Sequence, residues 1–212
     1  MFDLHSILET SEQLMTLDPS RAKPSDLPGR FGRVVHDVER LLQACVADAT
    51  VVGGWSVWHY GYVGRVTHDL DIVISHEHEE PLVRLSSMFG FRPLGVHEGN
   101  WPKLEHKETG IEVDLMPEGR RPGLASNLGP TPIRHPREYA SSDGLLPYVT
   151  IAGLFELKLG SWRVKDQADL IELIKVNGHR MDAVHSHVAG MHGVLNERFE
   201  YLVAAAKNET NN

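Results

Sequence analysis

Two aspartates separated by a single residue could bind one cation together. Asp69 and Asp71 belong to residues 69–75, DLDIVIS, where alternating apolar residues predict a β-strand. Side chains alternate between the two faces of a strand, so both carboxylates point the same way, about 6.6 Å apart along the backbone. Carboxylates this close repel each other unless a cation lies between them. Mg²⁺ suits this position because it prefers carboxylate and phosphate oxygens.

A third acid comes from a second predicted strand. In residues 111–117, IEVDLMP, the acids Glu112 and Asp114 alternate with apolar residues. We expect residues 101–110 to supply the first strand and the turn of a hairpin that ends in this strand. If it lies beside residues 69–75, Asp114 or Glu112 completes a three-carboxylate site.

A glycine turn precedes the first of these strands. Gly53 and Gly54 follow a short apolar run, and Ser56 stands where we expect a short helix to begin. Glycine lets backbone N–H groups approach an anion closely, and the start of a helix favours negative charge. The turn is therefore expected to hold phosphates, with a hydrogen bond from Ser56. The alternative is an ordinary connection between a strand and a helix.

The order of these motifs resembles the nucleotidyltransferase superfamily, which has the DNA polymerase beta-like fold. The segments GGWS and GRVTHDLDI, followed by the acid in VDL, are most similar to antibiotic nucleotidyltransferases. The later segment LFELKLGSWRVKDQADLIEL resembles AbiEii-type toxin nucleotidyltransferases. The resemblance covers roughly residues 50 to 176. It implies an α/β (α+β) fold, a mixed sheet flanked by helices, and transfer of a nucleoside monophosphate from a nucleoside triphosphate (NTP).

The resemblance also implies roles for individual residues. Asp69, Asp71 and Asp114 become the catalytic acids and the ligands of two Mg²⁺ ions. Glu112 is left as a possible general base, since an acid that binds no metal can take the proton of an acceptor hydroxyl. The expected nucleotide-binding residues are Gly53, Gly54, Ser56, Arg65, Thr67 and Lys158.

Each polar residue near this predicted site also has a structural interpretation. Arg65 and Thr67 could contact phosphates, or they could hold the loop before the strand. Lys158 ends an apolar helical stripe, so it either extends to water or enters the cleft. Asp166, with Asp169, would most simply form ion pairs on a helix surface. Alternatively, one of these acids orients Lys158 or contacts the acceptor.

Composition limits the classes of protein that remain. The 212 residues are 41% apolar, enough to form a real core in one domain or two small ones. The net charge of −8 argues against a surface devoted to wrapping nucleic acid, although a local basic patch could hold a tRNA end. The single cysteine, Cys45, fits a reducing compartment. The N-terminal sequence resembles neither a signal peptide nor a membrane span, so we expect a cytoplasmic protein without membrane contact.

We expect three regions along the chain. Residues 1–30 would form an N-terminal helix and linker, residues 31–149 the nucleotidyltransferase domain, and residues 150–212 a C-terminal helical region. The stretch 117–147 is rich in Gly, Pro, Ser and Arg and lacks periodicity, which is typical of a functional loop. Residues 182–207 are predicted to form one long helix.

The sequence favours a Mg²⁺-dependent nucleotidyltransferase that uses an NTP. Its acceptor hydroxyl could belong to a tRNA 3′ end, a protein or a small molecule such as an antibiotic, and the toxin-like segment raises the possibility of a cognate antitoxin. One alternative is a non-catalytic nucleotide-binding module that keeps the fold, but the presence of all three acids favours catalysis. Another is a His-rich metal carrier, although residues such as His76 and His78 lack a zinc-site pattern.

Overall fold

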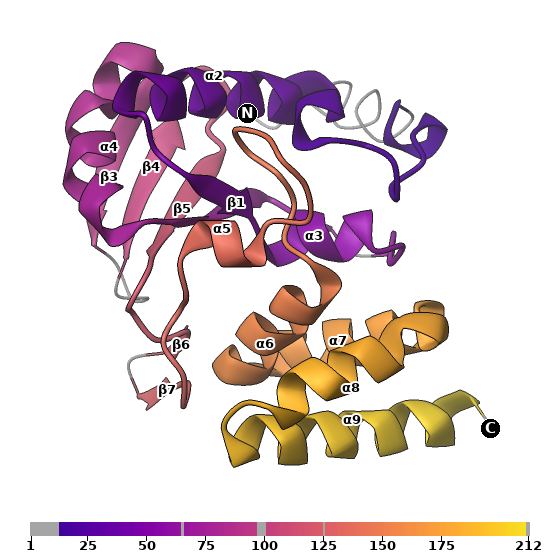
Figure 1. The fold of residues 1–212 in the computed structure, drawn as a ribbon. Helices are drawn as coiled ribbons and strands as arrows, with labels where there is room; N and C mark the ends of the chain where they lie inside the picture. Colours follow the sequence, from indigo (N-terminus) through magenta and orange to yellow (C-terminus); the bar gives the residue numbers. More distant parts are fainter. Residues whose placement is uncertain (1–12, 65, 97–100, 125, 211–212) are drawn as a thin grey trace.

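A mixed β-sheet lies at the centre of the protein, which is described here from a computed structural model of residues 13–64, 66–96, 101–124 and 126–210. Among these residues the sheet has five strands in the order β1-β2-β5-β4-β3. Helix α2 lies along one side of this sheet, and the C-terminal helices α6 to α9 lie on the other (Figure 1). The mixed α/β architecture with a helical C-terminal region is thus confirmed.

Strands β2 and β5 are the parallel pair, and every other pair of neighbours in the sheet is antiparallel. The strands of the sheet are β1 (Ala49–Val51), β2 (Asp69–Ile74), β3 (Phe91–Val96), β4 (Pro102–His106) and β5 (Glu112–Pro117). A separate small hairpin consists of β6 (Gly123–Leu124) and β7 (Asn127–Leu128). The predicted hairpin that ends in β5 is confirmed.

Helices follow the apolar periodicity of the sequence. They are α2 (Gly29–Cys45), α3 (Gly53–His59), α4 (Glu79–Leu85), α5 (Pro136–Tyr139), α6 (Ile151–Ser161), α7 (Val164–Val176), α8 (Met181–Ala189) and α9 (Gly193–Thr210). Short 3₁₀ turns are η1 (Pro24–Asp26), η2 (His76–His78), η3 (Ser86–Phe89) and η4 (Gly178–Arg180). Most of the predicted N-terminal helix lies outside the described residues, although residues 13–16 are helical. None of the described helices is long and apolar enough to cross a membrane.

The single long helix expected over residues 182–207 is wrong. Helix α8 ends at Ala189, and a new helix, α9, begins at Gly193. At this start the ring of His192 accepts a hydrogen bond from the Val194 backbone. Val184 on α8 and Phe199 on α9 enter the same apolar core, so the apolar pattern continues across the break. Periodicity therefore could not reveal that the chain turns back on itself.

The sheet separates two apolar cores. On one face, Leu70 and Ile72 of β2 pack in a core with the apolar stripe of α2. On the other face, Val73 of β2 and Met116 of β5 join a core formed with helices α6 to α9. Cys45, at the end of α2, is half-buried, and burial raises the pKa of its thiol, so it is an unreactive packing residue.

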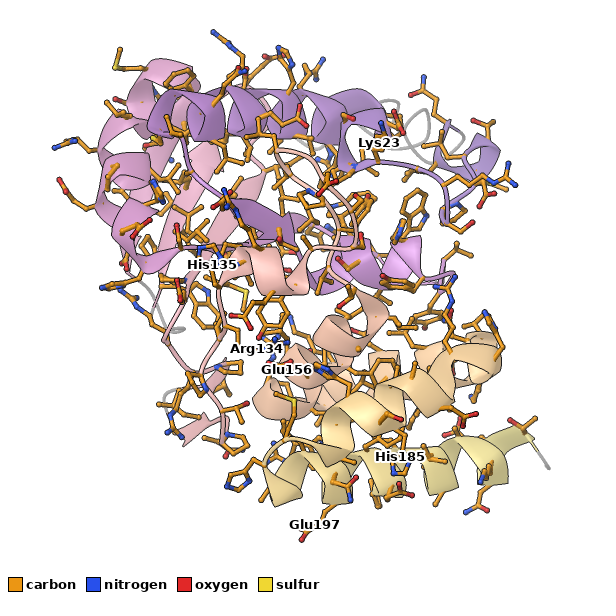
Figure 2. All side chains as sticks on the ribbon, viewed as in Figure 1. Lys23, Arg134, His135, Glu156, His185 and Glu197 are labelled. Carbon is orange, nitrogen blue, oxygen red and sulfur yellow. The ribbon has the colours of Figure 1, made fainter. Side chains whose placement is uncertain are left out.

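The predicted loop over residues 117–147 is anchored by a buried carboxylate. Glu156 of α6 is 2% exposed and receives two hydrogen bonds from Arg134, at 3.1 and 2.7 Å. The Tyr139 hydroxyl donates to it at 2.7 Å, and the His187 ring lies 2.8 Å away. Figure 2 shows Arg134 and Glu156 side by side. The loop is thus fixed to the C-terminal helices by a satisfied buried charge.

Candidate active site

Strand register brings the predicted acids together. In the parallel pair β2–β5, Asp71 lies directly opposite Asp114, and Asp69 lies opposite Glu112. Neighbouring strands are about 4.8 Å apart, so these side chains leave the sheet next to one another. Asp71 and Asp114 share their face with Val73 and Met116 two residues further along, which is the face that meets helices α6 to α9. The acids therefore converge at the boundary between the sheet and the C-terminal helices.

The pKa values of the acids show that the described residues around them carry too little positive charge. Burial, followed by the charges of Asp69 and Asp114, raises the pKa of Asp71 to about 7. Burial also raises the pKa of Asp114, an effect that Lys103 opposes and Asp69 reinforces. At neutral pH Asp71 is thus poised between its protonated and ionised forms, which is how a site short of cations behaves.

Lys103 is a member of the site that the sequence analysis missed. It lies on β4 directly opposite Asp114, and its ammonium group is 2.9 Å from Asp114 Oδ1 and 3.1 Å from Glu112 Oε2. Lys103 and Asp114 form an ion pair. The contact does not have the geometry of a hydrogen bond, because the buried Asp114 Oδ1 atom accepts no hydrogen bond. The available signal was the register of the predicted hairpin, which places Lys103 across from Asp114.

The glycine turn touches the acids. Gly53 has a φ of +61°, and a Cβ atom at this position would lie 1.7 Å from Asp71 Oδ2. Only glycine fits here, both for its backbone conformation and for the space that the carboxylate occupies. The backbone N–H of Val52 also donates to the Asp71 carbonyl at 2.9 Å. The turn and the paired acids thus lie side by side, as expected.

Ser56 lies elsewhere than expected. Helix α3 begins at Gly53 itself, so Ser56 falls inside the first turn, fully buried, and its hydroxyl donates to the Val51 carbonyl at 2.9 Å. In this arrangement the hydroxyl closes the strand-to-helix connection and does not face a ligand. Thr67 is half-buried in the loop before β2. Arg65 lies outside the described residues.

A second charged cluster lies between α6 and α7. Lys158 is 5% exposed, and its ammonium group donates to Asp166 at 3.1 Å and to Asp169 at 2.6 Å. Arg163 adds a bond to Asp166 at 2.7 Å. Lys158 therefore does not extend to water, and the two acids do not form surface pairs. Of the sequence-based alternatives, the geometry favours the one in which the acids orient Lys158.

The two clusters act on each other. The charges of Lys158 and Lys165 oppose the rise in the pKa of Asp71. Burial works against the charge of Arg163, but its bonds to Asp166 and the fields of Asp71 and Asp69 outweigh burial and raise its pKa. The end of α6 and the start of α7 therefore present positive charge to the acids of the sheet.

The acids suit Mg²⁺ chemically, although their side chains are not yet arranged around an ion. Among the described residues, no three His, Cys, Asp or Glu side chains are grouped to hold a metal. Asp69, Asp71 and Asp114 nevertheless offer hard oxygen ligands from strands already in register, with a charge deficit that a divalent cation would offset.

Comparisons with known proteins concern the fold. Neither a family model nor a curated protein matches the sequence. The antibiotic-resistance factor ANT(2'')-Ia is similar to 84% of this chain over 91% of its own, with 15% identity and a TM-score of 0.42. Its complex with adenylyl-2''-tobramycin gives 15% identity and a TM-score of 0.39 over 84% of this chain and 97% of that one.

A third solved structure is a putative nucleotidyltransferase from Thermotoga maritima. It covers 68% of this chain and 91% of its own, with 21% identity and a TM-score of 0.42. At such scores the likenesses assign no activity by themselves. The chemistry of this chain therefore has to be judged from its own side chains.

Proposed function

We propose that this protein is a nucleotidyltransferase that moves a nucleoside monophosphate from an NTP to an acceptor hydroxyl. The observation that carries the proposal is the position of Asp71, which lies opposite Asp114 on the neighbouring strand and against the Gly53 turn. A glycine turn and a group of carboxylates with too little positive charge around them thus meet at one point. Phosphoryl chemistry needs this combination, because polyphosphate and cations have to be held together.

Each part of the site has a role in the proposed reaction. Gly53 and Gly54 let the backbone approach the triphosphate. Asp69, Asp71 and Asp114 would hold Mg²⁺, which when bound offsets phosphate charge and lowers the pKa of an acceptor oxygen. Lys158 and Arg163 add positive charge on the helix side, with Lys158 oriented by Asp166 and Asp169.

The proposed reaction balances without a further reactant. The acceptor oxygen forms a bond to the α-phosphorus of the NTP, and the bond from that phosphorus to the oxygen bridging to the β-phosphate breaks. Pyrophosphate leaves with the electron pair. The acceptor proton passes to a carboxylate, and we assign this role to Glu112, since it is half-buried beside the group and has no proposed metal.

The test is transfer of label from α-labelled NTPs. The protein is incubated with Mg²⁺, each NTP in turn, and one of three acceptors: bulk tRNA, a protein mixture, or tobramycin, the antibiotic found adenylylated in the ANT(2'')-Ia complex. We expect pyrophosphate release with one NTP and labelling of one acceptor class. Asp71→Asn should lower the rate at least about 1000-fold. Asp182→Asn, an exposed change on α8, is the matched control.

Circular dichroism must show that the Asp71→Asn protein is folded. Full transfer by this variant would remove the catalytic proposal. Labelling of tRNA or protein would favour the toxin-type role and a cognate antitoxin as partner, whereas labelling of tobramycin would favour the antibiotic-modifying role.

A non-catalytic nucleotide-binding module is the second candidate, and Lys103 favours it. The Lys103 ammonium already contacts Asp114 and Glu112, so it supplies positive charge that a metal would otherwise supply. The two candidates differ in the behaviour of Lys103→Gln. NTP binding without pyrophosphate release, in both the wild type and this variant, would identify the module.

A further inference from the structure

A cavity of about 580 Å³ lies at the opposite end of α3 from the Gly53 turn. Its walls are residues 20–25, the end of α3 at His59, the loop 141–148 and Arg180. None of the acids or glycines of the candidate active site lines it. The volume is within the range of cavities that hold small molecules. The last part of the long loop, which the proposed reaction does not use, thus forms one wall of this cavity.

A buried polar atom of a residue that lines this cavity has no partner. Tyr148 is 3% exposed, and its hydroxyl makes no hydrogen bond. The ring of His59, which is held by the backbone of Pro19 and Ala22, stacks on the ring of Tyr148 with centroids 4.3 Å apart. Nearly all buried polar groups in native proteins are hydrogen-bonded, so an orphaned hydroxyl at a cavity indicates a missing ligand.

More basic than acidic side chains line the cavity. Arg21, Lys23 and Arg180 line the cavity, against the acids Glu39 and Asp143. Arg21 pairs with Asp18 at 3.4 Å, but the described part of the chain offers no carboxylate to the ammonium of Lys23 or the guanidinium of Arg180. Figure 2 labels Lys23 on the segment beside η1. Lys23 and Arg180 are therefore available to form ion pairs with a ligand.

The lining is mixed, with polar side chains beside the rings of His59, Tyr60 and Tyr148. Burial lowers the pKa of His59, so its ring is uncharged at pH 7 and Nδ1 donates or accepts according to the tautomer. Tyr60 closes one side, with Arg180 5.6 Å from its ring centroid, and Leu146 and Pro147 add apolar surface. A ligand that fits has an apolar or flat body and an anionic end.

We propose that this cavity binds a small organic anion, in which a phosphate or carboxylate group is joined to a compact ring. The Tyr148 hydroxyl donates to an anionic oxygen, the ring of the ligand lies beside the stacked rings of His59 and Tyr148, and Lys23 and Arg180 balance the negative charge. The proposal goes beyond the nucleotidyl transfer proposed above and does not depend on it, because the two sites share no residue.

The test is calorimetry on the full chain with phenyl phosphate and benzoate, and with benzyl alcohol as the neutral control. We expect one of the two anions to bind in a 1:1 ratio and benzyl alcohol to bind much more weakly. NMR of the histidine rings should show a shift at His59. Tyr148→Phe should weaken binding of the anion about tenfold or more, the value of a hydrogen bond to a charged group. Arg180→Gln should weaken it less.

Tyr148→Phe is informative because the hydroxyl it removes has no partner, so the variant should fold with at least wild-type stability. Tyr201→Phe, at an exposed tyrosine of α9, is the matched control and should bind like the wild type. The proposal is overturned if neither anion binds, if Tyr148→Phe binds unchanged, or if benzyl alcohol binds equally well.

Asp71→Asn separates this cavity from the proposed active site. Binding at the cavity should persist in Asp71→Asn, whatever that variant does to nucleotidyl transfer. Binding of phenyl phosphate that is lost in Asp71→Asn but kept in Tyr148→Phe would belong to the acids of the sheet and would overturn the assignment to the cavity.

Discussion

Two charge clusters meet at the boundary between the sheet and the C-terminal helices, and only one of them is balanced. The helix cluster pairs two cations with two acids: Lys158 and Arg163 with Asp166 and Asp169. Among the described residues, the sheet cluster has one contacting cation, Lys103, which meets two of its four acids, Asp69, Asp71, Glu112 and Asp114. The two clusters also differ in burial, since the side chains of Lys158, Asp166 and Asp169 are at most 6% exposed, whereas those of Lys103 and Glu112 are 25% and 46% exposed.

The pKa values of two acids show what this difference means. Burial alone would raise the pKa of Asp166, but Lys158 and Arg163 hold it well below its ordinary range. Asp71 feels the same Lys158 more weakly than it feels its carboxylate neighbours, and its pKa rises to about 7. The helix cluster is complete as folded, whereas the sheet cluster is completed by a proton or a cation. Incomplete pairing distinguishes a ligand site from a structural ion pair.

The largest effect on stability is expected from breaking the balanced cluster. Lys158→Met leaves two buried carboxylates with Arg163 as their main cation, which should lower the free energy of unfolding by about 3–5 kcal/mol. Urea unfolding measures this change. Lys165→Met, at an exposed neighbour, should change it by less than about 0.5 kcal/mol. Equal losses in the two variants would show that burial of Lys158 is not what matters.

Gly53→Ala should be the next most damaging change. The alanine would adopt a positive φ, and its Cβ would displace the Asp71 carboxylate, for a combined loss of about 2–3 kcal/mol. Thermal unfolding would report the loss of stability, and calorimetry with NTP would report any change in nucleotide binding. Gly178→Ala is the control, since a Cβ atom added there would meet no other atom within 4 Å. A Gly53→Ala protein of wild-type stability would contradict the contact with Asp71.

Asp71→Asn should stabilise the metal-free protein at high pH. Folding raises the pKa of Asp71 from 3.8 to about 7. Below pH 3.8 the carboxyl is protonated in both the folded and the unfolded protein, so folding carries no penalty there. As the pH rises through 7 the folded protein loses this proton and is destabilised. At pH 8 the asparagine variant should be more stable by up to about 4 kcal/mol, with no gain at pH 3.5. Added Mg²⁺ should stabilise the wild type alone. A variant less stable at pH 8 would contradict the charge deficit.

Ser56→Ala should have the smallest effect. Loss of the bond to the Val51 carbonyl should lower the free energy of unfolding by about 1 kcal/mol, with the Kd for NTP unchanged. Chemical denaturation measures the free energy of unfolding, and calorimetry measures the Kd for NTP. Weaker NTP binding at unchanged stability would restore the phosphate-binding role predicted from the sequence.

Local patterns were sufficient to predict the acids and the turn. Alternation placed Asp69 and Asp71 on one face of a strand, and turn residues marked the hairpin that carries Asp114. The contact between Gly53 and Asp71 agrees with this prediction because the turn and β2 belong to one continuous segment. Interactions that follow from period and turn chemistry are therefore readable from the chain.

Interactions that depend on register or distant contacts were missed. Ser56 lies inside α3 because this helix begins three residues earlier than expected. Helix boundaries are the feature that a sequence predicts least reliably. Lys103 required the hairpin register, and Arg134 meets Glu156 across 22 residues of chain. No local pattern specifies such partners.

The parallel pairing of β2 and β5 also affects folding. One acid pair is carried by the β1–α3–β2 segment and the other by the β4–β5 hairpin, two units with their own local contacts. The two acid pairs repel each other only once the two units dock. Docking also lowers the conformational entropy of the chain that links the units. The docking step should therefore take up a proton or a metal ion, so that refolding is faster at mildly acidic pH, or with Mg²⁺, than in alkaline solutions of chelator.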